Sequence, residues 1–501
     1  MSEDTAGSIG RLNEDVGCRI LLELPTPDLL SLSMTCRPLR NTCMPFLFGR
    51  SYITIYGPPQ VEKPELFLPT SLRPYVHSLV IHDKCLDQRS IHHMNQRLYF
   101  TDNYMRCGAF PGSSLSQRLR ELSRLRSLTI YKDNSSTHGL SWETLRALLS
   151  VPQLHEVKLR WLYFCPDLRP GEELTIDSPA PITSFHYRMY HPRDPFSFPS
   201  ETAALSAALH SLCETLETIV LCSESAPLST MPHFHWPRLR KLVFYGMPWT
   251  TLPAPFVSLC LGMQSLQSLS LKLYATPSAA PQPLWPSGQS CAFPWPALER
   301  LVISFPDPQD EIYDHLPSSL RALSLRCWPH LHVQRRWRGF GFAWRQRDNA
   351  MLDSSAMLSI LRRCNTLDLD HLEVEYCVDN EDGALLQYVA TTFPHLTSLK
   401  IHCYQSALGE GRNISVVQIA QSLASLTELR RLKVYLDVVV VSQPDMVPPR
   451  TNLQNAAALF AQILSSSLRE VVICSKDLPS WHKFQVVGRC AHRLDARLSE
   501  R

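Results

Sequence analysis

The first apolar pattern of the chain covers residues 12–52 and predicts short helices in succession. Asn13 is a favourable N-cap, and apolar side chains then recur every fourth residue from Val16 to Leu24. Pro25 follows and ends this pattern. The sequence therefore predicts an amphipathic first helix that begins just after Asn13.

Two further helical patterns follow in the same segment. Thr26 is placed to cap the second helix with its hydroxyl, and Pro27 and Asp28 suit the first turn. Pro38 can start the third helix, after which the chain becomes extended over residues 51–56. The segment is thus predicted to be a three-helix module ahead of a region with a different rhythm.

From residue 76 onward, a short string with the pattern apolar-x-x-apolar-x-apolar returns about thirteen times. The copies are Val76-Leu79-Ile81, Leu125-Leu128-Ile130, Leu154-Val157-Leu159, Ile182-Phe185-Tyr187, Leu216-Ile219-Leu221, Leu239-Leu242-Phe244, Leu266-Leu269-Leu271, Leu298-Leu301-Ile303, Leu320-Leu323-Leu325, Leu369-Leu372-Val374, Leu396-Leu399-Ile401, Leu429-Leu432-Val434 and Leu468-Val471-Ile473. The last two apolar positions alternate as in a half-buried strand, and the first fits the turn that enters it. Each copy therefore predicts one strand.

Helical patterns lie between many of these strings, with predicted starts at Ser141, Asp353, Asn380, Asn413 and Asn452. A strand and a return helix in each unit is the sequence signature of a leucine-rich-repeat solenoid, whose units must stack to bury one continuous core. The predicted fold class is α/β, with the three-helix module followed by an irregular leucine-rich-repeat-like solenoid of parallel strands and return helices. A general α/β domain with leucine-rich strands is the competing interpretation.

Three stretches interrupt the repeat and are predicted to be loop insertions, near residues 275–296, 330–350 and 442–450. The second stretch contains HVQRRWRGFGFAWRQR, which interleaves arginines with aromatic residues. Its candidate partner-binding residues are Arg335, Arg336, Trp337, Arg338 and Trp344. This segment could cover the repeat array, grip an acidic or phosphorylated peptide through bidentate arginine contacts, or stack on single-stranded nucleic acid. The favoured interpretation is that the segment covers the repeat array. Binding of a protein partner is the second choice, and binding of nucleic acid is the third.

The order of residues in the first module resembles the F-box, which docks its protein onto the Skp-type adaptor of a cullin ubiquitin ligase. The matching positions are Leu12-Asn13, Glu14-Asp15, Ile20-Leu21, Leu24, Pro27-Asp28-Leu29-Leu30, Leu32-Ser33, Cys36, and Phe46 to Phe48. Asn13 stands where the family usually has proline. The resemblance implies adaptor contact by Leu12, Ile20, Leu24, Asp28, Leu29, Leu32 and Cys36. Spacing alone also allows an ordinary capping bundle, and it does not divide these residues between the adaptor interface and the core of the module.

Phrases such as Trp236-Pro237-Arg238-Leu239 and Trp295-Pro296-Ala297-Leu298 introduce strands in the style of fungal F-box proteins with degenerate leucine-rich repeats. The resemblances together imply an F-box at residues 12–52 and a substrate-recognition solenoid at residues 53–501. The implied function is that of substrate receptor in a Skp–cullin–F-box (SCF) ubiquitin ligase. Its implied partners are a Skp-family adaptor, a cullin held through that adaptor, and an unknown protein substrate. The alternatives are a repeat scaffold without a ligase, and an enzyme with an unrecognised site in an α/β domain.

Charge and targeting signals do not point to a membrane or to nucleic acid. The formal net charge is +3, and basic and acidic residues nearly balance, so no general attraction to polyanions is expected. The segment MSEDTAGSIG lacks a signal-peptide pattern, and no uninterrupted apolar run approaches the length of a membrane span. The expected location is the cytoplasm or the nucleus.

Motifs for catalysis, metals or cofactors were not found in the sequence. The 16 cysteines are scattered singly, without a Cys-x-x-Cys pair, so reduced and mostly buried cysteines are expected. There is no Gly-x-Gly-x-x-Gly, Gly-Lys-Ser/Thr, His-Glu-x-x-His or Gly-x-Ser-x-Gly motif. The nearest ligand clusters, His92-His93 and Asp368-Leu369-Asp370, are isolated pairs. The sequence therefore predicts a protein that is not an enzyme and has no metal or cofactor.

Overall fold

The structure, a computed structural model, describes residues 13–56, 67–84, 112–132, 139–165, 168, 173–189, 198–249, 251–274, 283–289, 293–338, 351–364, 368–405, 415–437, 449–476 and 480–494. These residues form two compact units, the first ending at Thr218 and the second beginning at Ile219. Both units combine helices with a mostly parallel β-sheet, so the α/β prediction is confirmed.

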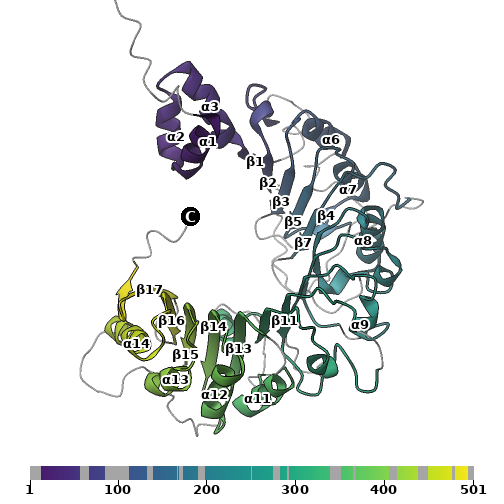
Figure 1. The fold of residues 1–501 in the computed structure, drawn as a ribbon. Helices are drawn as coiled ribbons and strands as arrows, with labels where there is room; N and C mark the ends of the chain where they lie inside the picture. Colours follow the sequence, from purple (N-terminus) through teal and green to yellow (C-terminus); the bar gives the residue numbers. More distant parts are fainter. Residues whose placement is uncertain are drawn as a thin grey trace, which may run out of the picture. The chain divides into compact units, whose positions relative to one another are not determined.

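The first unit opens with three short helices, α1 (Glu14–Glu23), α2 (Thr26–Ser33) and α3 (Arg37–Phe48) (Figure 1). Asn13 caps α1 as predicted, since its side-chain oxygen accepts a hydrogen bond from the Asp15 N–H at 3.0 Å. The predicted cap at Thr26 is wrong. Pro25 takes the extended conformation of a cap residue, so Thr26 is already the first residue of α2 and no side chain caps this helix.

The sheet of the first unit has the strand order β1-β2-β3-β5-β7, and each neighbouring pair is parallel. Its strands are β1 (Arg50–Ile55), β2 (Ser78–Asp83), β3 (Ser127–Lys132), β5 (Glu156–Arg160) and β7 (Ser184–Arg188), and β4 (Gly139–Leu140) pairs separately with β6 (Tyr163–Phe164). The other elements of this unit are the 3₁₀ turn η2 (Arg73–Tyr75) and helices α6 (Gly112–Arg120), α7 (Trp142–Leu149) and α8 (Pro199–Leu212). The register places Leu79 beside Leu128 and Leu128 beside Val157, so the repeated apolar positions stack.

The sheet of the second unit runs in chain order from β8 to β18. Strands β9 to β16 are parallel, and the last two strands join antiparallel. The strands are β8 (Thr218–Cys222, which begins at the unit boundary), β9 (Lys241–Gly246), β10 (Ser268–Leu273), β11 (Arg300–Ser304), β12 (Ala322–Arg326), β13 (His371–Cys377), β14 (Ser398–Tyr404), β15 (Arg431–Leu436), β16 (Glu470–Ser475), β17 (His482–Val487) and β18 (Cys490–Arg493).

Every predicted repeat string coincides with a strand. The last two apolar residues of each string lie within the strand, and the first lies just before it. The register keeps these residues in rows, as where Leu372, Leu399 and Leu432 lie side by side and are all buried. A shift of one residue would move a whole row to the other face, so the leucine pattern fixes the pairing.

Helices cover one face of β13 to β16 (Figure 1). They are α11 (Ser354–Arg363), α12 (Asp382–Thr392), α13 (Val416–Ser422) and α14 (Pro449–Ile463). The helix predicted to start at Asn452 instead begins one turn earlier, because Pro449 suits a first helical turn. No helix in the described part of the chain has the length and apolar character needed to cross a membrane.

The prediction of a return helix in each repeat is wrong between β8 and β12. The connections there contain the short elements η3 (Ser223–Ser225), η4 (Met231–His233), α9 (Phe256–Leu259) and η5 (Glu311–Asp314). Between β12 and β13, α10 (Leu331–Arg338) is followed by α11, which is capped by Asp353 as predicted. Prolines interrupt the connections between β8 and β12, and buried Trp236, Trp285 and Trp295 fill the space beside the strands. Each indole N–H donates to a backbone carbonyl, at 3.0 to 3.2 Å. A tryptophan therefore replaces the helix in this part of the unit.

The predicted insertions are described only in part. In the first, the Leu284 and Trp285 N–H groups donate to the buried Asp310 carboxylate at 2.7 and 3.0 Å, which ties residues 283–289 to the fold. The second contains α10, and its residues 339–350 lie outside the described part, as do residues 442–448 of the third.

Candidate functional site

The three N-terminal helices enclose a small apolar core of their own. Leu21, Leu29 and Cys43 are buried in it, and four partly buried residues pack against them: Leu24, Leu32, Phe46 and Leu47. Leu21 comes from α1 and Leu24 directly follows its end, Leu29 and Leu32 come from α2, and the others come from α3. The helical spacing seen in the sequence therefore brings these residues together.

The structure divides the predicted adaptor-binding residues into two groups. Leu29 belongs to the core of the helices, and Leu24 and Leu32 pack partly against it. Ile20, Asp28 and Cys36 are exposed. Leu12 lies outside the described residues. Only the exposed group is free to meet a partner without disturbing the core.

The same helices expose an unusual amount of apolar surface. Among the described residues, half of the exposed large apolar side chains fall between positions 16 and 34: Val16 (45%), Ile20 (47%), Leu22 (69%), Leu30 (50%) and Met34 (65%). Val16 and Ile20 lie one turn apart on α1, and Leu30 and Met34 are likewise separated by four residues. We call these five residues the apolar surface. Exposed apolar side chains gathered on one short module are candidates for partner contact, although Leu22 points to a different side of α1 from Val16 and Ile20.

Sequence reasoning named only Ile20 of this apolar surface as an adaptor contact. Val16 was predicted on the apolar stripe with Ile20 and Leu24, but the structure leaves both Val16 and Ile20 exposed. Leu30 was a position of the F-box motif without a predicted contact, and Leu22 and Met34 were not singled out. Exposed side chains could have been found only once the packing of α1 against α3 was known.

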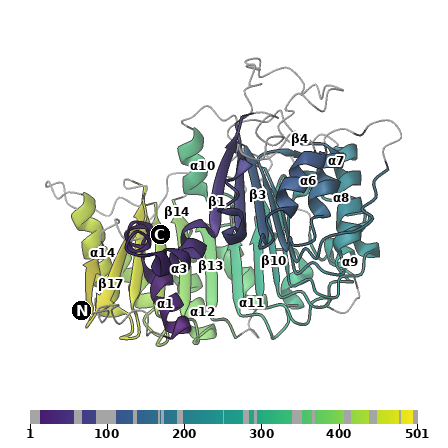
Figure 2. The same ribbon diagram turned by 90° about the horizontal axis from the view of Figure 1, so that it is seen from above.

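The arginine-aromatic segment is described at its start. Arg335, Arg336, Trp337 and Arg338 belong to helix α10, but their side chains lie outside the described part, as does all of Trp344. The first residue of α10, Leu331, is buried against Tyr404, Tyr435 and Cys474 at the C-terminal ends of β14 to β16. Figure 2 shows α10 at this end of the strands. The segment thus begins by covering the sheet, on the face opposite α11 to α14, which we call the polar face.

Just before α10, a buried carboxylate holds the chain to the polar face. Glu375 of β13 accepts hydrogen bonds from the N–H groups of Cys327 and Leu331, both at 2.9 Å. It also accepts from the Tyr404 hydroxyl at 3.0 Å and from Nδ1 of His330 at 2.6 Å. Four donors satisfy a carboxylate well, which explains why Glu375 tolerates burial.

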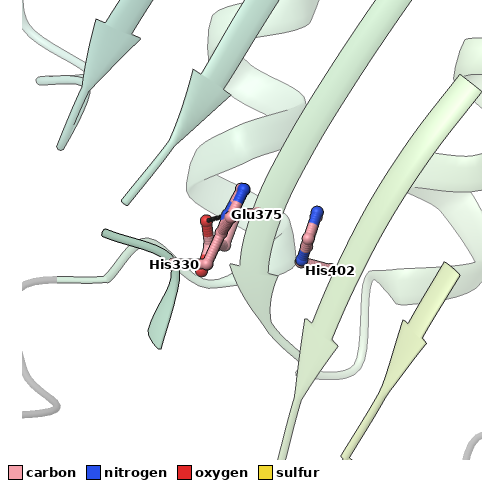
Figure 3. Close-up of side chains that lie close together, drawn as sticks. All are labelled: His330, Glu375 and His402. Carbon is pink, nitrogen blue, oxygen red and sulfur yellow. Dashed lines mark hydrogen bonds and ion pairs between the residues drawn. The ribbon is translucent and has the colours of Figure 1, made fainter. Parts of the chain in front are cut away.

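His330 and His402 stack face to face beside this carboxylate (Figure 3), with ring centroids 4.1 Å apart and planes 10° from parallel. Arg326 donates to Nε2 of His330 at 2.9 Å, so Nδ1 carries the proton given to Glu375. His402 is fully buried, and neither of its ring nitrogens has a hydrogen-bond partner. Burial, followed by the neighbouring His330 and His332, holds the pKa of His402 well below its ordinary value, so the ring is neutral.

His330, Glu375 and His402 bring three possible metal ligands within 4.8 Å of one another. Two features oppose a metal ion in this arrangement. The lone pairs of imidazole lie in the ring plane, so two parallel stacked rings cannot both direct one at a single ion. The Arg326 guanidinium also occupies Nε2 of His330, and its charge repels a cation. The cluster is therefore an anchor for the residues that lead into α10 and not a preformed metal centre.

Sequence reasoning did not find this cluster. Its three residues are 45 and 27 positions apart, and they meet only because β13 and β14 pair in register and a loop folds back over them. The one signal was that Glu375 and His402 occupy polar positions of alternating strands.

The sequence matches no model of a known protein family and no curated protein. Its function must therefore be inferred from its own residues.

Proposed function

We propose that this protein is the substrate receptor of a Skp–cullin–F-box ubiquitin ligase. In this proposal, α1 to α3 are the F-box and bind a Skp-family adaptor, which holds the cullin. The strands that follow are a degenerate leucine-rich-repeat solenoid that binds a protein substrate, in the cytoplasm or the nucleus. The protein itself transfers no ubiquitin.

The observation that carries the proposal is the apolar surface on the three helices. The residues there follow the order of the F-box motif, and Ile20 is both a motif position and exposed. An ordinary capping bundle would bury its apolar side chains against the region that it caps. Val16, Leu22, Leu30 and Met34 instead remain exposed, as expected for helices that await a partner.

The repeating strands support the second part of the proposal. Within each unit the parallel strands follow chain order, and their buried residues stack in register. This pattern is typical of solenoids, which bind proteins through extended surfaces. A receptor that holds adaptor and substrate together would act by proximity, because tethering raises the local concentration of substrate lysines at the transfer site.

Adaptor capture tests the proposal directly. The full chain is co-purified with a Skp-family adaptor, and the variant Ile20→Ser/Leu30→Ser/Met34→Ser is compared with it. Because these side chains are exposed, the variant should keep its helices yet bind the adaptor at least about tenfold more weakly. The matched control Leu261→Ser/Val487→Ser removes exposed apolar side chains from the second unit and should bind normally.

Two outcomes would contradict the proposal. If the parent chain fails to capture any Skp-family adaptor, the protein is better described as a repeat scaffold without a ligase. If the triple variant binds as well as the parent, then the exposed apolar side chains are not the adaptor interface.

A further inference from the structure

Residues 327–334 cross the C-terminal ends of the strands on the polar face of the second unit, and we call them the strap. The strap is an addition to the repeat, because the connection between β12 and β13 also contains a helix of the covering layer, α11. The Leu331 side chain is buried, and the N–H groups of Cys327 and Leu331 donate to the Glu375 carboxylate. The strap therefore rests on the sheet as a separate layer, on the face opposite the helices.

Three imidazole rings stack where the strap meets the sheet. His330 and His332 belong to the strap, and His402 belongs to β14 (Figure 3 shows His330 and His402). The ring centroids of His330 and His332 lie 4.1 and 5.7 Å from that of His402, and the three ring planes are within 16° of parallel. His402 is fully buried, with no hydrogen bond to either ring nitrogen. Lifting the strap would take both stacked rings away from His402 and give it access to water.

Among the described residues, three cations and two carboxylates face this stack. They are Arg326 of β12, Lys400 of β14, Lys433 of β15, and Glu373 and Glu375 of β13. Both carboxylates already have partners, since Glu375 accepts from four donors and Glu373 pairs with Arg326 at 3.4 Å. The Glu373 carboxylate lies 3.9 Å from Nε2 of His402, which is too long for a hydrogen bond. Protons added to the stack would therefore increase a net positive charge.

The other titratable groups packed in this region are Cys327, Tyr404, Tyr435 and Cys474. Burial raises the pKa values of Cys327 and Tyr404 well above their ordinary values, and it raises the pKa of Cys474 to about 12. The Tyr435 ring stacks on His332, with ring centroids 4.6 Å apart. Because histidine is the side chain that ordinarily changes its charge between pH 5 and 8, the stacked imidazoles are the groups of this site that respond to mild acid.

We propose that residues 327–334 are an acid-sensitive strap, which is closed on the polar face while the stacked histidines are neutral and is released when they take up protons. An imidazolium ion at His402 would lie 4.1 Å from the His330 ring, in a buried site that already faces Arg326 and Lys433. Like charges repel strongly where water is excluded, so the closed form disfavours this proton. The proposal concerns the second unit and does not rest on the proposed function.

The directions of the pKa values agree with this arrangement. Burial, followed by the neighbouring His330, lowers the pKa of His332 to about 4. Burial, followed by both strap histidines, lowers the pKa of His402 well below its ordinary value. In the open form both rings meet water, where a histidine pKa is about 6.5. A histidine with a lower pKa in the closed form stabilises closure fully above about pH 7, and it loses this contribution as the pH falls.

Hydrogen exchange of the full chain between pH 7 and pH 5 tests the proposal. The measured quantity is the protection factor, the intrinsic exchange rate of an amide at each pH divided by its observed rate. Protection of the Leu331 amide should fall over this range by roughly 25-fold for each histidine, and by roughly 500-fold for both. The Leu399 amide, inside β14 between two parallel neighbours, should stay at least about tenfold better protected than Leu331 at every pH.

Two variants assign this loss of protection to the histidines. His332→Asn/His402→Leu cannot take up these protons, so its Leu331 protection should change by less than about fivefold between pH 7 and pH 5. The control His492→Asn removes an exposed histidine of the same unit and should lose protection as the parent does. Adaptor capture at pH 7 should be the same for all three proteins, because α1 to α3 are unchanged.

NMR of the histidine rings in the parent gives a measurement that needs no variant. The His332 and His402 rings should become protonated over the pH range in which Leu331 loses its protection. Protonation of His402 while Leu331 stays protected would overturn the proposal, because the closed strap would then tolerate the charge. Constant Leu331 protection down to pH 5 would also overturn it, as would equal protection of Leu331 and Leu399 at every pH or a parent-like loss in the double variant.

Discussion

At the scale of single residues, Glu375 and His402 lie next to each other on the polar face but differ in their hydrogen bonding. The Glu375 carboxylate receives four hydrogen bonds, three from residues 327–331 and one from Tyr404 of β14. The His402 ring receives none at either nitrogen. Replacing the first should therefore loosen the fold, and replacing the second should not.

Glu375→Gln should destabilise the second unit by about 2–4 kcal/mol, because an amide cannot accept from all four donors and leaves buried N–H groups unpaired. Urea denaturation gives the loss of stability, and hydrogen exchange at the Leu331 amide should show that the start of α10 opens. The exposed Glu381→Gln serves as the control. Unchanged exchange at Leu331 would show that Glu375 does not hold α10.

The neutral His402 should make stability depend on pH. Its pKa is depressed in the folded protein, whereas the unfolded chain takes up the proton near the ordinary value of about 6.5. The neutral His402 ring therefore contributes its full share to the free energy of unfolding above about pH 7. This share declines as the pH falls toward 5, by about 1.4 kcal/mol per pH unit for one proton. His402→Leu should remove this slope at little loss of stability at pH 7. Parallel urea-denaturation results for parent and variant between pH 7 and 5 would contradict the assignment.

At the scale of elements, the sequence pattern predicts that the three N-terminal helices exist but not all of their details. The apolar spacing over residues 12–52 is sufficient to predict three helices, but two residues of the predicted first stripe, Val16 and Ile20, are exposed in the structure. Spacing could not predict that Thr26 lies inside α2, since prolines on both sides of it set the backbone. In the structure Leu29 is buried, whereas its neighbour Leu30 is exposed.

The different burial of Leu29 and Leu30 predicts different effects when each is replaced by aspartate. Leu29→Asp places a charge in the core of α1 to α3 and should unfold these helices, so adaptor capture is lost together with helical protection in hydrogen exchange. Leu30→Asp changes an exposed side chain, so it should reduce capture while α1 to α3 stay protected. If both variants keep their helices, then Leu29 is not a core residue.

At the scale of the whole molecule, the strands were the most predictable part of the fold. Strings such as Leu396-Leu399-Ile401 place a strand correctly because one buried face repeats every second residue. The cluster of His330, Glu375 and His402 could not be predicted from the sequence. It depends on pairing between distant strands and on a loop that folds over them, and neither leaves a local pattern in the sequence.

The receptor role also makes a prediction for the whole molecule in cells. A chain that lacks residues 12–52 should still bind substrate but not the adaptor, so its substrates should accumulate. Quantitative proteomics of cells with the parent or the shortened chain measures this accumulation. The same set of proteins should accumulate with Ile20→Ser/Leu30→Ser/Met34→Ser, which is expected to lose the adaptor. No shared set would argue against a degradation pathway through this surface.

The buried tryptophans of the connections between β8 and β11, where long helices are missing, affect how this protein tolerates mutation. In the later repeats, burial is spread over helices of 7 to 15 residues, so no single side chain is decisive. In the middle repeats, Trp236, Trp285 and Trp295 are buried, stack or pack against other aromatic rings, and each donate a hydrogen bond to a backbone carbonyl. Replacing one of them removes a large buried side chain and a hydrogen bond in a single step. Sequence drift should therefore be slow at these three positions and fast in the helices.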